Sequence, residues 1–190
     1  MNDKTSDIGV QDSVPFDQAY WVVPHKLLAG CYPGSENARQ AQHQLQGLLM
    51  HGVRHVINLM EPDEFNRYGR MFVPYENLMT SIAATMGVEV GFDRMPIKDW
   101  SVPSRSTMGR ILDRIDACIS QQKPVYVHCL GGLGRTGTVV GCYLARHGYA
   151  TDRNVLQLIQ QLRQNSPIRH RTSPETRAQL DMVQSWVQGE

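Results

Sequence analysis

The chain has 190 residues, of which 41% are hydrophobic and 19% charged, and its 19 Lys and Arg against 18 Asp and Glu leave a net charge of +1. These are the proportions of a globular domain, and no run approaches the ~20 consecutive apolar residues of a membrane helix, so a wholly disordered chain and a membrane-spanning one are both excluded. The balanced charge gives no general attraction to nucleic acid or to an anionic membrane. We expect neither as a partner, and we expect any phosphate site to be local.

Residues 1–14 are polar and mixed in charge, so we predict a flexible N-terminal segment followed by one domain over residues 15–190. The segment lacks the basic stretch followed by an apolar stretch that marks a secretory signal, and we expect a cytoplasmic protein. The four cysteines then stay reduced, and three of them, Cys31, Cys118 and Cys142, are predicted to fill the core.

The first half of the chain alternates strands with helices. Its predicted elements are, in order, a strand pair over residues 21–30, a helix with Leu45, Leu48 and Leu49 on one face that ends near Gly52, a buried strand over 55–60, a polar loop, and a weak helix within 78–86.

The second half continues the alternation. Its predicted elements are a partial strand over 88–97, a loop over 98–103, a helix capped by Ser104 or Ser106, a central strand over 125–128, an apolar helix over 138–146, an amphipathic helix with Val155, Leu158, Ile159 and Leu162 on one face, and a last helix marked by Leu180, Val183 and Val187. This order predicts the α/β class: a single domain with a central mixed, mainly parallel sheet flanked by helices.

A glycine-rich loop joins the central strand to the apolar helix. Gly131, Gly132 and Gly134 let the backbone curl so that successive N–H groups point inward, and the following helix offers its positive N-terminal end to the same space. A phosphate-sized dianion fits such a cradle, and Arg135 adds a planar fork that can bind two of its oxygens. The same field favours the thiolate form of Cys129, which is the nucleophilic form of a cysteine. The loop is therefore predicted to bind a phosphate group and to attack it.

The spacing of Cys129 and Arg135 alone is weak evidence, because the chain has three other cysteines. At the equivalent place after Cys31, Cys118 and Cys142, however, the residues are Asn37, Pro124 and Gly148. The strand before Cys129, the three glycines and the apolar helix after it make a coincidence improbable.

The run from His128 to Thr136 resembles the H-C-x5-R-[ST] motif of the cysteine-dependent protein tyrosine phosphatase superfamily. Within that superfamily the chain is similar to the compact dual-specificity branch, bacterial members included, from about residue 21 to 186. The resemblance implies that Cys129 forms a phosphocysteine intermediate, that Arg135 holds the phosphoryl group, that Thr136 bonds to the leaving sulfur and that His128 orders the loop. It also implies that the loop residues bind the substrate, namely Leu130, Gly131, Gly132, Leu133 and Gly134.

The family uses an aspartic acid on a separate loop as the general acid, often with a proline shortly after it. Asp99, four residues before Pro103, matches this pattern, with Asp93 and Asp63 as alternatives. Such a carboxyl group protonates the leaving oxygen and later activates the attacking water.

Two segments near the C-terminus have two readings each. Pro174 to Gln179 resembles a segment that some bacterial members carry near the active site, or it is an ordinary helix N-terminus with Glu175 in the first turn. The run Arg169–His170–Arg171 is either a solvated charge cluster or a contact for a substrate anion.

These features predict a phosphate-monoester hydrolase that needs no metal or cofactor. A phosphorylated protein or peptide is the expected substrate, because the interior of the loop adds no cation beyond Arg135, and phosphate, vanadate or tungstate are expected inhibitors. The alternatives are a phosphoinositide, inositol phosphate or RNA 5′-phosphatase on the same fold, a rhodanese-like sulfurtransferase, and an inactive phospho-binding module.

Overall fold

The fold was analysed on a computed structural model that describes residues 13–66 and 68–190. Its strands are β1 (Ala19–Val23), β2 (Leu27–Gly30), β3 (His55–Asn58), β4 (Gly91–Arg94) and β5 (Val125–His128). Its helices are α1 (Ala38–Met50), α2 (Glu76–Thr85), α3 (Arg105–Ser120), α4 (Gly134–Arg146), α5 (Arg153–Leu162) and α6 (Arg177–Ser185). The flexible segment predicted over residues 1–14 falls mostly on residues 1–12, which lie outside the described residues.

The five strands form one sheet in the order β1-β2-β5-β3-β4. β1 pairs with β2 antiparallel, and the other three pairs are parallel. The predicted fold is therefore confirmed: a single α/β domain with a mixed, mainly parallel sheet. β5 is the middle strand, and it is paired on both sides, so its carboxyl end is held more firmly than that of any edge strand.

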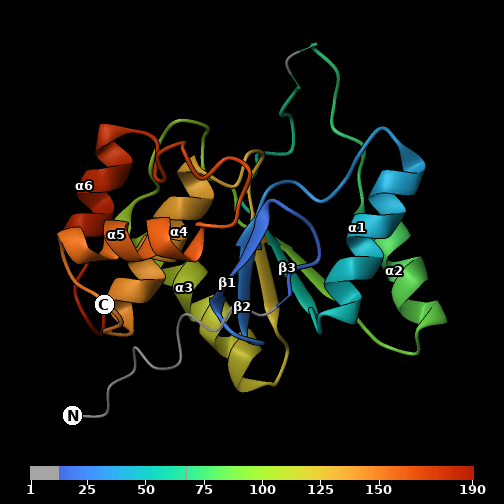
Figure 1. Cartoon of the computed structure of the whole chain (residues 1–190), viewed down its shortest axis with the longest axis horizontal. Helices are drawn as coiled ribbons and strands as arrows, with labels where there is room; N and C mark the ends of the chain where they lie inside the picture. Colours follow the sequence, from blue (N-terminus) through green and yellow to red (C-terminus); the bar gives the residue numbers. More distant parts are fainter. Residues whose placement is uncertain (1–12, 67) are drawn as a thin grey trace.

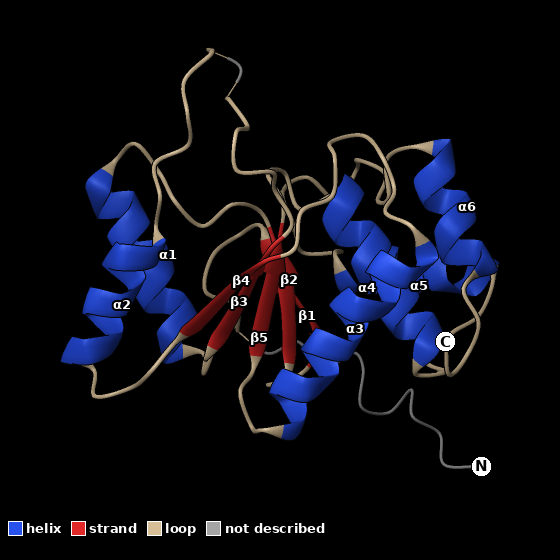
Figure 2. Ribbon diagram, turned by 180° about the vertical axis from the view of Figure 1, so that it is seen from behind, coloured by secondary structure: helices blue, strands red, loops and turns tan. Residues whose placement is uncertain are grey.

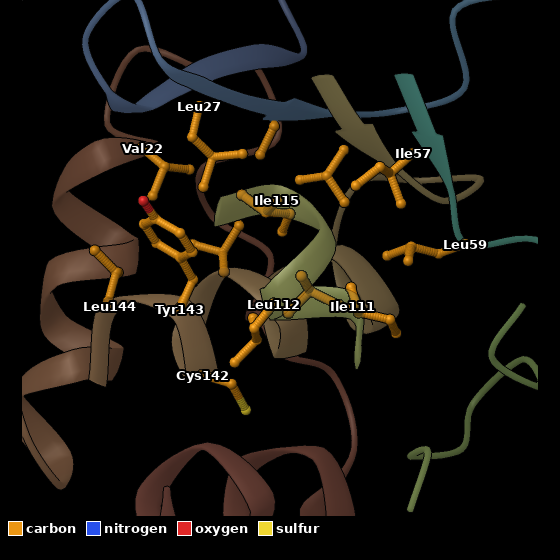
Figure 3. Packing of buried hydrophobic residues seen from close by; sticks show 14 of the residues in the cluster. Val22, Leu27, Ile57, Leu59, Ile111, Leu112, Ile115, Cys142, Tyr143 and Leu144 are labelled. Carbon is orange, nitrogen blue, oxygen red and sulfur yellow. The ribbon is translucent and has the colours of Figure 1, made fainter. Parts of the chain in front are cut away.

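Helices cover both faces of the sheet, with α1 and α2 on one side and α3 to α6 on the other (Figures 1 and 2). β5 contributes to both cores because its side chains alternate. Val125 and Val127 belong to the larger core, with residues of α3, α4, α5 and α6, whereas Tyr126 packs with residues of α1 and α2. Figure 3 shows Leu27 and Ile57 of the sheet over Ile111, Leu112 and Ile115 of α3.

Local signals set several boundaries. Gly52 follows α1 as predicted, with a φ of +86°, and at the start of this helix the Asn37 side chain accepts hydrogen bonds from the backbone of Arg39 and Gln40, a cap that was not predicted. Ser104, rather than Ser106, caps α3. The strand over 125–128 has the predicted bounds.

Other predicted boundaries were wrong. β3 and β4 are shorter than the strands predicted over 55–60 and 88–97, and α4 begins at Gly134 rather than Thr138. α6 ends at Ser185, so Val187 lies beyond it and is exposed. None of the helices in the described part is long and apolar enough to cross a bilayer.

Candidate active site

The glycine-rich loop leaves the carboxyl end of β5 and turns directly into α4. Cys129 comes first and is only 3% exposed, whereas the next side chain, Leu130, points partly to solvent. Gly132 has a φ of +70°, and a Cβ there would lie 2.6 Å from the backbone carbon of Gly30. Only glycine fits this position, because both the backbone conformation and the approach to β2 exclude a side chain.

Gly134 has a different role from the one expected of it. It lies in the first turn of α4 and is helical, so it does not curl the loop. A Cβ at this position would lie 2.9 Å from Glu175 Oε2, so a small residue here lets the segment before α6 approach the loop.

His128 is buried beneath the loop and connects it to α2. Its Nδ1 lies 3.1 Å from the Cys129 carbonyl oxygen and its Nε2 lies 2.6 Å from Tyr75 Oη. Burial lowers the pKa of His128 to about 3, so the ring is neutral at physiological pH. A carbonyl oxygen can only accept, so Nδ1 carries the proton and donates it, and Nε2 accepts from the Tyr75 hydroxyl. The Cys129 carbonyl thus fixes the tautomer of His128, and the Tyr75 hydroxyl holds the opposite edge of the ring.

Arg135 lies in the first turn of α4 with its side chain 1% exposed. Its two terminal nitrogens bind the Glu64 carboxylate, with Nη2 3.0 Å from Oε2, and Nη1 also donates to the Ile97 carbonyl at 3.1 Å. Burial opposes the charged form, but the hydrogen bond to Glu64 and the neighbouring negative charges raise the pKa of Arg135. Its buried Nε finds no hydrogen-bond partner among the described residues.

Asp99 also approaches the guanidinium of Arg135. Its Oδ1 is 3.2 Å from Arg135 Nη2, and its side chain is 51% exposed. The residue after it, Trp100, is exposed and has a φ of +58°, a conformation that is costly for a non-glycine residue and often occurs at functional sites. The structure therefore brings Asp99, from a separate loop, to Arg135, whose guanidinium also interacts electrostatically with Cys129.

The two alternative aspartates are placed differently. Asp93 lies on β4, two strands from β5, and its carboxylate binds His55 Nε2 at 2.7 Å and the Arg114 side chain. Asp63 is exposed on the loop after β3, and it is the next residue, Glu64, that contacts Arg135.

Thr136 is buried at the start of α4. Its hydroxyl lies 3.5 Å from the Gly30 carbonyl oxygen, which ties the helix to β2. A bond from this hydroxyl to the Cys129 sulfur stays a prediction.

The segment before α6 wraps around the far side of the loop. The Ser173 hydroxyl donates to the Leu133 carbonyl at 2.8 Å, and the buried Gln179 donates to the Ser101 carbonyl at 3.1 Å. Thr176 caps α6, so Glu175 precedes the helix and the first-turn reading was wrong. Glu175 Oε1 instead lies 2.8 Å from Arg171 Nη2, so one residue of the Arg169–His170–Arg171 run is already paired with a carboxylate.

Sequence reasoning missed Glu64 and Tyr75. A signal for Glu64 existed, because it follows a strand whose carboxyl end was expected at the same sheet edge as Cys129. Tyr75 had none, since its partner lies 53 positions away.

Comparisons with known proteins agree with this geometry. A family model described as "Polymorphic toxin system, DSP-PTPase phosphatase" matches residues 31–149. The chain is 30% identical over 132 residues to the mouse dual specificity protein phosphatase CDC14B, covering 67% of this chain and 24% of that protein. It is 32% identical over 140 residues to the bovine protein tyrosine phosphatase domain-containing protein 1, covering 73% of this chain and 16% of that protein. The chain thus spans a quarter or less of the length of these curated relatives.

Solved structures agree on the fold. The active form of Tk-PTP superposes with a TM-score of 0.59 at 21% identity, covering 90% of this chain and 97% of that one. PTPMT1 in complex with PI(5)P gives a TM-score of 0.61 at 20% identity over 90% of this chain and 94% of that one. A catalytic-site Cys-to-Ser form of kinase associated phosphatase gives 0.62 at 16% identity, covering 91% and 94%. At these identities the likeness establishes the fold alone.

The fold and the cysteine loop define the class of cysteine-dependent tyrosine and dual-specificity phosphatases. The match over residues 31–149 shows the family: this chain belongs to the DSP-PTPase phosphatases.

Proposed function

We propose that the protein hydrolyses phosphate monoesters through a phosphocysteine intermediate on Cys129. The observation that carries the proposal is the guanidinium of Arg135. Its side chain is 1% exposed, Arg135 lies in the first turn of α4 directly after the cysteine loop, and its buried Nε–H has no partner among the residues described. A buried donor left unpaired costs ~1–3 kcal/mol, and a bound phosphoryl oxygen would remove that cost.

The reaction takes two in-line displacements at phosphorus. The Cys129 thiolate forms the S–P bond while the P–O bond to the leaving group breaks, and Asp99 gives its proton to the departing oxygen. A water molecule then attacks the phosphorus, gives a proton to the Asp99 carboxylate, and the S–P bond breaks to release phosphate and the thiolate. The loop amides and Arg135 stabilise the charge on the equatorial oxygens in both steps.

We propose a phosphorylated protein or peptide as the substrate, with activity on phosphotyrosine. The depth of the cleft decides whether phosphoserine and phosphothreonine also react, because a deep cleft admits only phosphotyrosine. The residues between Cys129 and Arg135 carry no charge, which supports a singly phosphorylated group over a highly charged inositol phosphate or an RNA 5′ end. Vanadate and tungstate, which mimic the phosphoryl group, should inhibit. A thiolate nucleophile needs reducing conditions, which supports our proposal of a cytoplasmic location.

The test is the substitution Cys129→Ser. We expect hydrolysis of para-nitrophenyl phosphate to be abolished. Binding of inorganic phosphate, measured by calorimetry, should remain, because the backbone amides of the loop are unchanged. Cys142→Ser is the control, since Cys142 is a buried thiol within α4. Turnover by Cys129→Ser, or an equal loss in a folded Cys142→Ser, would refute the assignment.

A further inference from the structure

A groove of about 810 Å³ opens beside the active-site loop and runs away from it towards α1. Leu130 and Cys31 border it on the loop side, and α1 borders it through Gln40 and Gln44. Met71 and Phe72, from the segment that rises above the sheet between β3 and α2 in Figure 1, form another wall. The groove adjoins the reacting groups without including Cys129, Arg135 or Asp99, so it is placed to hold a part of the substrate beyond the phosphate.

The groove is lined by apolar and aromatic side chains together with polar ones. Phe16, Tyr32 and Phe72 contribute rings, and Gln18, Gln40 and Asn66 contribute amides. Amide side chains both donate and accept hydrogen bonds, as the backbone of an extended peptide does. The Oε1 atom of Gln44 is buried and has no donor within the described part of the chain, so it offers an acceptor to a bound N–H group.

The charge of the groove selects between ligand classes. Among the described residues that line it, none is Lys or Arg, and the carboxylates are Asp17 and Glu36. Glu36 is paired with the exposed Arg70 at 3.7 Å, and Asp17 is an exposed carboxylate. A polyanionic headgroup or an RNA chain would meet both carboxylates, and like charges across an interface are unfavourable. A peptide with basic residues would meet complementary charge, and one with uncharged residues would meet no repulsion.

Resting on the function proposed above, we propose that this groove binds the polypeptide that flanks the phosphorylated residue, and that it favours apolar and basic side chains over acidic ones. The groove has the size typical of specific ligand sites, and it begins at Leu130, the residue after the nucleophile. The substrate is thus recognised as a segment of protein and not as a phosphate group alone.

The experiment compares kcat/KM for four substrates. These are para-nitrophenyl phosphate, two phosphopeptides that differ only in carrying lysines or glutamates around the phosphorylated residue, and vesicles that contain a phosphoinositide. The peptides are made in phosphotyrosine and phosphothreonine forms. At low salt we expect kcat/KM for the lysine peptide to be at least tenfold higher than kcat/KM for the glutamate peptide. This ratio should decrease as added salt screens the charges.

A matched pair of variants locates the effect. Met71, 59% exposed, lines the groove, and Met50, 68% exposed, lies at the end of α1 outside it. Met71→Ser should lower kcat/KM for the lysine peptide about five- to tenfold, whereas Met50→Ser should not, and both should match wild type on para-nitrophenyl phosphate. A double substitution of Asp17→Asn and Glu36→Gln should abolish the preference for lysine.

Three results would overturn the inference: equal rates on the two peptides, equal effects of Met71→Ser and Met50→Ser, or faster turnover of the phosphoinositide than of either peptide. The proposed function itself would fail in a different way: the protein would show no Cys129-dependent turnover of para-nitrophenyl phosphate.

Discussion

The guanidinium of Arg135 binds the carboxylate of Glu64, and in the proposed mechanism it also binds the phosphoryl group. Glu64 holds both terminal nitrogens, which leaves Nε for a substrate oxygen and keeps the plane of the guanidinium fixed. Fixing the plane aids catalysis, because donors that are already oriented need no reorganisation in the transition state. The negative charge of Glu64 should weaken phosphate binding, because it offsets part of the positive charge of Arg135 that attracts phosphate.

Glu64→Gln separates these two effects. The amide keeps the shape but accepts through one oxygen only, so we expect kcat on para-nitrophenyl phosphate to fall about tenfold while vanadate inhibits at a lower concentration. Steady-state kinetics and a vanadate titration measure both quantities. If kcat and inhibition were unchanged, Glu64 would have no part in positioning Arg135.

Asp99→Asn tests the general acid. General acid catalysis contributes ~10²–10⁴-fold, and more when the leaving group is poor. The variant should therefore slow a phosphotyrosine peptide strongly and a fluorinated aryl phosphate much less, and it should flatten the alkaline limb of the pH profile of kcat/KM. If both substrates were slowed equally and the bell-shaped profile stayed intact, Asp99 would not be the general acid. The alternative Asp93 is bound to His55 and Arg114 in the structure.

Residues that share a short motif could be predicted from the sequence, whereas residues that come together only in the folded structure could not. Cys129 and Arg135 were identified because their neighbours in the chain carry the signal. Asp99 needed the family pattern, since nothing around it indicates that it lies 3.2 Å from Arg135. Tyr75 contacts His128 through tertiary packing that the sequence does not indicate, whereas the position of Glu64 after a parallel strand indicated the correct edge of the sheet but not its contact with Arg135.

At the scale of the elements, the site is the junction of β5 and α4, and Gly132 is the residue that permits it. Gly132→Ala adds a Cβ at a φ of +70° and 2.6 Å from the Gly30 backbone. A left-handed conformation alone costs a non-glycine residue ~1–2 kcal/mol, so we expect the free energy of unfolding in urea to fall by at least this amount and kcat/KM to fall by two orders of magnitude or more.

The adjacent Gly131 provides the control. A Cβ there meets no atom within 4 Å, so Gly131→Ala should keep its stability and most of its activity. A loss of activity in Gly131→Ala as large as that in Gly132→Ala would mean that flexibility, and not the geometry at Gly132, matters in this loop.

The elements that were predicted well are those whose periodicity is strong. The four residues of β5 are all buried, and they form the β-rich run that the sequence shows. By contrast, β4 is an edge strand of intermediate burial, so its ends carry little hydrophobic signal. The start of α4 was missed because glycine is unfavourable in helices, yet Gly134 is helical where packing against Glu175 and Gln179 requires a small residue.

At the scale of the whole molecule, buried neutral histidines link stability to pH. Burial lowers the pKa of His128 to about 3 and also lowers that of His55. In the unfolded chain a histidine has a pKa of about 6.5, so between about pH 6.5 and 3 the unfolded chain binds protons that the folded protein does not. The free energy of unfolding should therefore fall as the pH is lowered through this window.

His128→Gln removes one of these groups, so its free energy of unfolding should fall less steeply between pH 7 and 4 than that of wild type. Urea unfolding followed by tryptophan fluorescence measures the slope. Gln42→Asn is the control, because Gln42 is exposed on α1 and neither side chain titrates, so the slope should be unchanged. Parallel slopes for wild type and His128→Gln would contradict the assignment of a depressed pKa.

The α/β class and the parallel character of the sheet followed from the alternation of elements. The strand order and the antiparallel position of β1 did not, because pairing partners depend on packing between segments far apart in the chain.

Three peripheral segments surround the active-site loop: the one that carries Glu64, the one that carries Asp99, and the one from Ser173 to Thr176. They come from separate places in the chain, while the loop itself belongs to the central strand and a buried helix. Lengthening a surface loop costs little, about 0.6 kcal/mol for each doubling, whereas an insertion between β5 and α4 would disrupt both cores. Each of the three segments can therefore gain or lose residues independently, and the same chemical centre can be adapted to new substrates by insertions and deletions alone.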